Sequence, residues 1–179
     1  MKRPFLTLGT VQFGHPYGLR RNAPLLTSPE VVRLLGQAVL AGIRHFDTAH
    51  AYGLAERRLG EASDQGVITP DCRILTKTPV DLRADQVDEC IEKAGQTLRR
   101  APLDVLTLHR WEHRHSEAET LWHALLRARD EGRVKALGAS VYTPAEACAA
   151  AQDPDITHLQ IPCNVLDGRW EHSELPSIQ

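Results

Sequence analysis

Short apolar runs alternate along the chain with longer segments in which apolar residues recur every three or four positions. The short runs predict β-strands, and the longer period predicts amphipathic helices. The predicted strands, in chain order, are Leu6–Thr10, Ile43–Thr48, Arg73–Lys77, Val105–His109, Val134–Ser140 and His158–Pro162. Such regular alternation is typical of parallel β/α units, in an open doubly wound sheet or in a barrel, and periodicity alone does not choose between the two.

Helix signals stand between these strands. Ser28 followed by Pro29 predicts an N-cap and a first helical residue, and Gly42 ends that helix. The other four helices are expected at Glu56–Ser63, at Ala84–Arg100, after a capping box at Ser116 to Glu119, and after a second capping box at Thr143 to Glu146. The segment 167–179 shows no clear period, and we expect an irregular tail there.

The composition is that of an ordinary globular protein. The 179 residues, 42% hydrophobic and 25% charged, suffice for a single domain over 1–179. A net charge of −2 gives no basic field that would gather nucleic acid or an anionic membrane surface. No apolar run is long enough to cross a bilayer. We therefore expect neither nucleic acid nor a membrane as a partner.

The four cysteines are far apart and form no C-x-x-C pair. This spacing argues against a disulfide framework or a zinc site, and it favours reduced thiols in the cytoplasm. The histidine-rich segment 109–115 has the composition of a metal cluster, but a polar loop explains it better, and we expect no metal.

Polar residues end four of the predicted strands: Asp47, Lys77, His109 and Ser140. Each follows the previous one after roughly 30 residues, the length of one β/α unit. In a β/α barrel these ends converge on the face where active sites form. Tyr52, in the loop after Asp47, would overhang the same face. Singly, each residue has an ordinary explanation as a cap, a solvated charge or a rim residue; together, they predict one site.

These residue types suit carbonyl reduction by a nicotinamide cofactor. As hydride reaches the carbonyl carbon, negative charge grows on the oxygen and a proton donor must be in place. Tyr52 would be that donor, and Lys77 would be the cation that lowers the phenol's pKa from its ordinary value of about 10. Asp47 would pair with Lys77, and His109 would orient the substrate oxygen. A Schiff base on Lys77 is the alternative, and it leaves Tyr52 and Asp47 without a task.

At these residues the sequence resembles the aldo-keto reductase family. The matching segments are Leu8-Gly9-Thr10, Gly42 to Ala49, Ala51-Tyr52-Gly53 with Glu56, Leu75 to Lys77, Leu106 to His109, Gly138 to Ser140 and Gln160 to Asn164. The resemblance implies a (β/α)8 TIM-type barrel, NADP(H) as cofactor and an aldehyde, ketone or sugar carbonyl as substrate. It implies that the catalytic residues are Asp47, Tyr52, Lys77 and His109. It places the cofactor against Gly9, Thr10, Asp47, Ser140 and Gln160.

Two features depart from the family pattern. Val141 follows Ser140, where many relatives carry an asparagine that contacts the nicotinamide amide. The family barrel has eight strands and eight helices, whereas this pattern predicts six and five. We therefore expect a barrel truncated to about six β/α units and incomplete at the C-terminus, without the phosphate contacts found near strands seven and eight. Open edges on the first and sixth strands make self-association possible.

Two classes of function stay open at this point. One is an NADP(H)-dependent oxidoreductase. The other is a non-catalytic binding or regulatory protein that keeps the pocket and has an incomplete cofactor site. A lyase acting through Lys77 ranks third.

Overall fold

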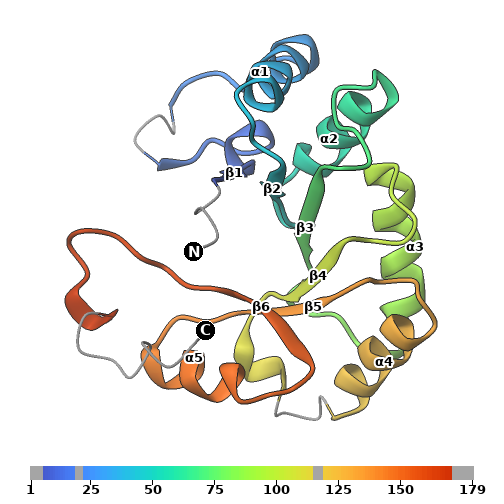
Figure 1. Cartoon of the computed structure of the whole chain (residues 1–179), viewed down its shortest axis with the longest axis vertical. Coiled ribbons are helices and arrows are strands. Elements are labelled where there is room, and N and C mark those ends of the chain that lie inside the picture. The colour runs from blue at the N-terminus through green and yellow to red at the C-terminus, as the bar shows by residue number, and fades with distance from the viewer. Residues whose placement is uncertain (1–5, 19–21, 115–118, 171–179) are drawn as a thin grey trace.

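The computed structural model describes residues 6–18, 22–114 and 119–170. Its strands are β1 (Thr7–Gly9), β2 (His45–Asp47), β3 (Arg73–Lys77), β4 (Val105–Leu108), β5 (Leu137–Ser140) and β6 (Ile156–Gln160). All neighbours pair in parallel, in the order β1-β2-β3-β4-β5-β6. A doubly wound sheet reverses its strand order at a switch point. The sequential order therefore identifies a half-barrel, with its helices on the outer side of the curved sheet (Figure 1).

The strand bounds differ from the prediction at several ends. The strand predicted at Arg73–Lys77 is confirmed. The fifth begins at Leu137 instead of Val134, because Val134 forms only an isolated bridge with Leu103. The sixth ends at Gln160, short of Pro162, which has no N–H to donate to a neighbouring strand. The first, second and fourth strands are also shorter than predicted.

Among the described residues five α-helices follow the strands, the number predicted: α1 (Ser28–Leu40), α2 (Ala55–Asp64), α3 (Val87–Leu98), α4 (Glu119–Asp130) and α5 (Pro144–Ala151). The helix predicted at Ala84–Arg100 is shorter at both ends, because Ala84–Gln86 forms a 3-10 turn and Arg99 is left-handed. The N-cap expected at Ser28 is wrong by one residue. Thr27 is the cap, and its backbone N–H and hydroxyl both donate to the Glu30 carboxylate, each at 2.7 Å. The capping box at Thr143 is confirmed. The one predicted at Ser116 lies outside the described residues.

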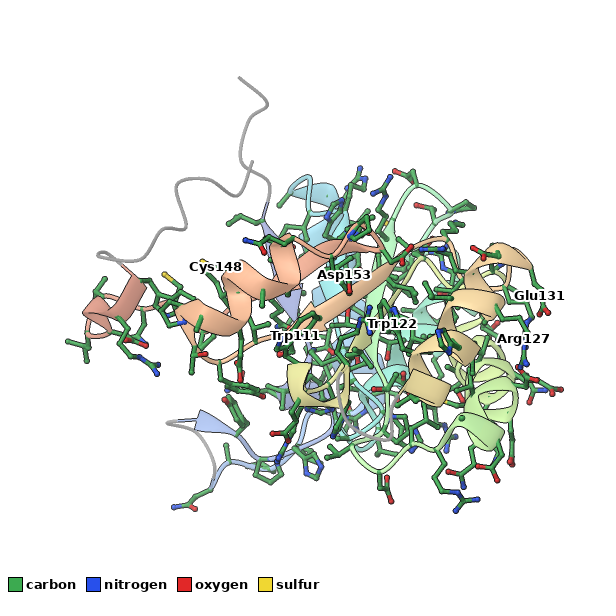
Figure 2. All side chains as sticks on the ribbon, turned by 90° about the horizontal axis from the view of Figure 1, so that it is seen from below. Trp111, Trp122, Arg127, Glu131, Cys148 and Asp153 are labelled. Carbon is green, nitrogen blue, oxygen red and sulfur yellow. The ribbon has the colours of Figure 1, made fainter. Side chains whose placement is uncertain are left out.

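The main core lies between the sheet and the helices. Phe46 of β2 and Leu35 of α1 are fully buried within it. In α4, Trp122 packs inward, whereas Arg127, together with Glu131 just after the helix, lies at the outer edge of the molecule (Figure 2). This layer of apolar contacts fixes the sheet from behind and leaves the carboxyl ends of the strands for polar side chains.

The segment expected to be an irregular tail contains a short 3-10 turn, Gly168–Trp170. Trp170 is buried in a small second cluster with Trp111 and α5 residues. Residues 171–179 lie outside the described part of the chain. No helix in the described part is long and apolar enough to span a membrane.

Candidate active site

Lys77 is the centre of the candidate site. It ends β3, and its side chain is only 4% exposed. Its amine Nζ donates to Asp47 Oδ1 at 2.6 Å, to the Thr48 carbonyl at 2.9 Å and to the Tyr52 hydroxyl at 3.4 Å. Asp47 ends the neighbouring strand β2, so the parallel pairing of β2 with β3 brings the two charges together. The structure thus places three of the four predicted catalytic residues in direct contact.

The expected effect of Lys77 on Tyr52 is not found. Burial, followed by the negative charge of Asp47, raises the pKa of Tyr52 to about 12, instead of the lowered pKa expected from a neighbouring cation. The Lys77 amine lies 5.0 Å from the centre of the tyrosine ring, but it is hydrogen-bonded to Asp47 and Thr48. Burial also lowers the pKa of Lys77, and Asp47 opposes that shift. Tyr52 is therefore a firmly protonated phenol, which is the form that a proton donor needs.

His109 lies beside these three residues without a hydrogen bond to them. It follows β4, which ends at Leu108, and its Nδ1 is 3.3 Å from the Thr78 carbonyl oxygen. Burial lowers its pKa, the Thr78 carbonyl opposes this, and the positive charge of Lys77 adds to the lowering. The imidazole is therefore neutral near pH 7. If Nδ1–H donates to Thr78, Nε2 remains as the free ring nitrogen.

The residues predicted to touch a cofactor lie at the same end of the sheet. Gly9 pairs with Asp47, and Ser140 pairs with Gln160. Thr10 is fully buried, and its hydroxyl donates to the Asp47 carbonyl at 2.9 Å, so it supports Asp47 directly. The Ser140 hydroxyl and the Gln160 carboxamide make no hydrogen bond to other described side chains or backbone groups. These two polar groups are therefore available to bind an amide.

A cavity of about 420 Å³ opens beside the site, in the loops that follow β4 and β5. Arg110, Trp111, Glu112, Tyr142 and Glu146 line it. Tyr142 is half exposed and acts electrostatically on Tyr52. The cavity is of a size that holds a small molecule.

Sequence reasoning missed two parts of the site. The Thr48 carbonyl is a ligand of the Lys77 amine, and no side-chain pattern reveals a backbone contact of this kind. Glu56 is buried on α2, and its carboxylate accepts a hydrogen bond from the Thr76 hydroxyl at 2.5 Å. Burial raises the pKa of Glu56. Glu56 belongs to a segment that matches the family pattern, so the sequence could have marked it as a site residue. The sequence gives no sign of its contact with Thr76 of β3.

Comparisons with known proteins identify the family and support the fold. The model of the aldo/keto reductase family matches residues 6–176. The 6-dehydroglucose reductase of Novosphingobium aromaticivorans is 27% identical, over 76% of this chain and 53% of its own length. A solved structure described as a 2,5-diketo-D-gluconic acid reductase B is 30% identical, with a TM-score of 0.68, over 89% of this chain and 53% of that one.

A structure described as an aldo-keto reductase of Pseudomonas aeruginosa has a TM-score of 0.77 at 23% identity, which supports the fold. The match extends over 92% of this chain and 65% of that one. The chain thus spans between about half and two thirds of the length of these relatives. With the family model matched over nearly all of its residues, the chain belongs to the aldo/keto reductase family.

Proposed function

We propose that this chain is an NADP(H)-dependent oxidoreductase that reduces an aldehyde, a ketone or a sugar carbonyl. The observation that carries the proposal is the contact of the Lys77 amine with Asp47 and Tyr52 at the carboxyl ends of parallel strands. Two of the relatives are named as reductases of sugar-derived compounds. These names support the sugar carbonyl among the three substrate classes.

Each side chain has one task in this proposal. Tyr52 gives its hydroxyl proton to the carbonyl oxygen as that oxygen becomes negative. Lys77 stabilises the phenolate that Tyr52 leaves behind, and Asp47 keeps the buried amine charged. Neutral His109, whose Nδ1–H donates to the Thr78 carbonyl, accepts through Nε2 a hydrogen bond from the hydroxyl that the substrate oxygen becomes, and so sets the direction of that oxygen. When bound, a reduced nicotinamide would supply the hydride for the carbonyl carbon.

The residues at the strand ends fit a nicotinamide. Ser140 and Gln160 offer a hydroxyl and a carboxamide that are adjacent in the pairing of β5 with β6. A Cβ atom at Gly9 would meet no atom within 4 Å, so the space above β1 is open. Val141 offers no side-chain hydrogen bond, and we expect Ser140 and Gln160 to hold the amide without it.

The deciding experiment is a fluorescence titration of the chain with NADPH, followed by an assay of NADPH oxidation with aldehydes, ketones and oxidised sugars. We expect saturable binding and turnover with at least one carbonyl class. Binding without turnover would favour the non-catalytic alternative, and absence of binding would overturn the cofactor assignment. The lyase alternative predicts that borohydride traps a substrate on Lys77, whose amine is already engaged by three oxygens.

Two further properties belong to the proposal. Among the described strands, β1 and β6 each have one unpaired edge, and such edges favour association with another chain. The four cysteines are free, which fits a reducing compartment such as the cytoplasm.

A further inference from the structure

Arg58 is a buried cation on the first turns of α2, and it is 7% exposed. No carboxylate in the described part of the chain lies within ion-pair distance of it. Its Nη1 donates to the Phe13 carbonyl, and its Nε is buried without a hydrogen-bond partner among the described atoms. A buried charge without a counter-charge is costly, and an apolar side chain of similar volume is often more stable in such a place. Stability alone therefore does not explain an arginine here.

The residue after Phe13 touches the loop that carries Tyr52. A Cβ atom at Gly14 would overlap the Tyr52 carbonyl oxygen and would lie 2.6 Å from the Leu54 nitrogen. From the other side, a Cβ at Gly53 would lie 2.6 Å from the Gly14 carbonyl oxygen. Because neither residue has a side chain, the two backbones are in direct contact. The position of Gly14 therefore limits where Tyr52 can lie.

The same Tyr52 carbonyl also joins the loop to α2. It accepts a hydrogen bond from the Ala55 N–H at 3.0 Å, at the start of the helix that carries Arg58. The contacts thus form a closed path from Arg58 through Phe13 and Gly14 to Tyr52 and back to α2. A shift of the Phe13 backbone would pass to Tyr52, whose hydroxyl must stay 3.4 Å from the Lys77 amine.

We propose that Arg58 is a positioning residue for Tyr52, which it holds toward Lys77 by fixing the Phe13–Gly14 backbone against the tyrosine loop. Arg58 acts through these backbone groups and does not touch the substrate. Its effect on turnover rests on the proposed function, whereas its effect on the environment of Tyr52 does not.

The first test compares Arg58→Met with Arg57→Met. Arg57 is the neighbouring residue on α2, but it is exposed and pairs with Glu61 at 3.0 Å, so it is a matched control. For R58M we expect kcat to fall at least about tenfold and KM to change less than about twofold, because small misplacements of a reacting group are costly. We expect its melting temperature to be unchanged or raised. A lowered melting temperature with an unchanged kcat would mean a merely structural role and would overturn the proposal.

The second test needs no turnover. The chain has three tyrosines, so subtraction of a Tyr52→Phe titration isolates the tyrosinate absorbance of Tyr52. Its midpoint, about 12 in the wild type, should fall toward the ordinary value near 10 in R58M, because a released phenol gains water. R57M should keep the wild-type midpoint. If neither the wild type nor any variant reduces a carbonyl, the proposed function fails, but this titration still decides the positioning role of Arg58. An unchanged Tyr52 midpoint in R58M would overturn that positioning role.

Gly14→Ala perturbs the contact between the Gly14 and Tyr52 backbones directly, and it replaces R58M as the test variant if R58M does not fold. Its added methyl group must displace the Tyr52 backbone, so it should lower kcat and the Tyr52 midpoint in the same direction. Arg58→Lys, which keeps a donor for the Phe13 carbonyl, should recover part of both quantities. Wild-type values of both in G14A would contradict the proposal.

Discussion

At the residue scale, the site depends on how a buried amine keeps its charge. Lys77 is almost fully buried, and Asp47, 17% exposed, supplies its counter-charge. Burial of a lysine favours the neutral form, whereas a carboxylate at 2.6 Å favours the charged form. Asp47 therefore keeps the Lys77 amine charged and also fixes its position.

Asp47→Asn removes the counter-charge and leaves the amine buried. We expect the free energy of unfolding to fall by about 3 kcal/mol, the usual cost of breaking a buried pair. Urea denaturation near neutral pH measures this. Asp64→Asn is the control, because Asp64 pairs with Arg99 at an exposed site and should cost less than about 1 kcal/mol. Equal losses for both variants would contradict the buried-pair account.

Tyr52→Phe tests the proton donor. The substitution removes one hydroxyl and keeps the ring, so we expect kcat for carbonyl reduction to fall by about 10²–10⁴. The dissociation constant for NADPH should change less than about twofold. Steady-state kinetics and NADPH fluorescence give the two quantities, with Tyr17→Phe as a control that keeps its activity. Retained turnover in Y52F would remove Tyr52 from the mechanism.

The raised pKa of Tyr52 also predicts a pH dependence of stability. An unfolded chain loses the tyrosine proton near 10, whereas the folded chain keeps it until about 12. The folded state therefore binds more protons in this interval, and stability falls as the pH rises through it. Compared by urea denaturation at about pH 9 and about pH 11, wild type should lose more stability than Y52F. A constant difference between the two would contradict the raised pKa.

The sequence predicts which residues of the site lie close together, but it does not predict the pKa of Tyr52. Spacing of roughly 30 residues was enough to predict that Asp47 and Lys77 meet, because each β/α unit returns the chain to the same face, and Tyr52 was predicted there from its place in the loop after Asp47. Spacing carries no information about burial. The direction of the pKa shift of Tyr52 depends on burial and on which partner the Lys77 amine faces, and it was predicted with the wrong sign.

At the element scale, β5 and α5 place Ser140 and the wall of the cavity. Thr143 caps α5: its hydroxyl accepts the Glu146 N–H at 3.2 Å, and Glu146 accepts from the Tyr142 and Thr143 N–H groups. Glu146 thus holds the turn that follows β5. Cavity residues Tyr142 and Glu146 are in this way fixed by the start of the helix.

Thr143→Ala should lower the free energy of unfolding by about 1 kcal/mol, the typical cost of losing an N-cap. Thr143→Ser keeps the hydroxyl and should stay close to wild type. Urea denaturation of both variants measures the difference. Equal stability of the alanine and serine variants would show that the capping hydrogen bond contributes nothing.

The predicted elements were correct in kind and order, and their errors have local causes. Thr27 and Ser28 are both good caps, so the sequence does not say which one caps α1, whereas the contact of Thr27 with Glu30 does. The start of β6 at Ile156 was missed because the pairing with β5 shifts by one residue between Leu137 and Gly138: Ile156 pairs with Leu137 and His158 with Gly138, and Thr157 lies between them. Irregularities of this kind depend on the partner strand and leave no mark in a single sequence.

At the scale of the whole molecule, the six strands form an arc with β1 at one end and β6 at the other (Figure 1). Each terminal strand presents unpaired backbone groups on one side. We expect a rise in apparent mass with concentration when the purified chain is examined by light scattering after size-exclusion chromatography. A single monomeric mass throughout a dilution series would contradict self-association through these edges.

The two halves of the proposed site sit on different parts of this arc. The proton-transfer groups stand on or after the inner strands β2 to β4, each flanked by two paired neighbours, whereas Gly9 and Gln160 belong to the terminal strands. A second chain that pairs with β1 or β6 would therefore change the affinity for the dinucleotide and leave the rate of proton transfer nearly unchanged. A higher protein concentration should then lower the dissociation constant for NADPH, while kcat at saturating NADPH stays the same.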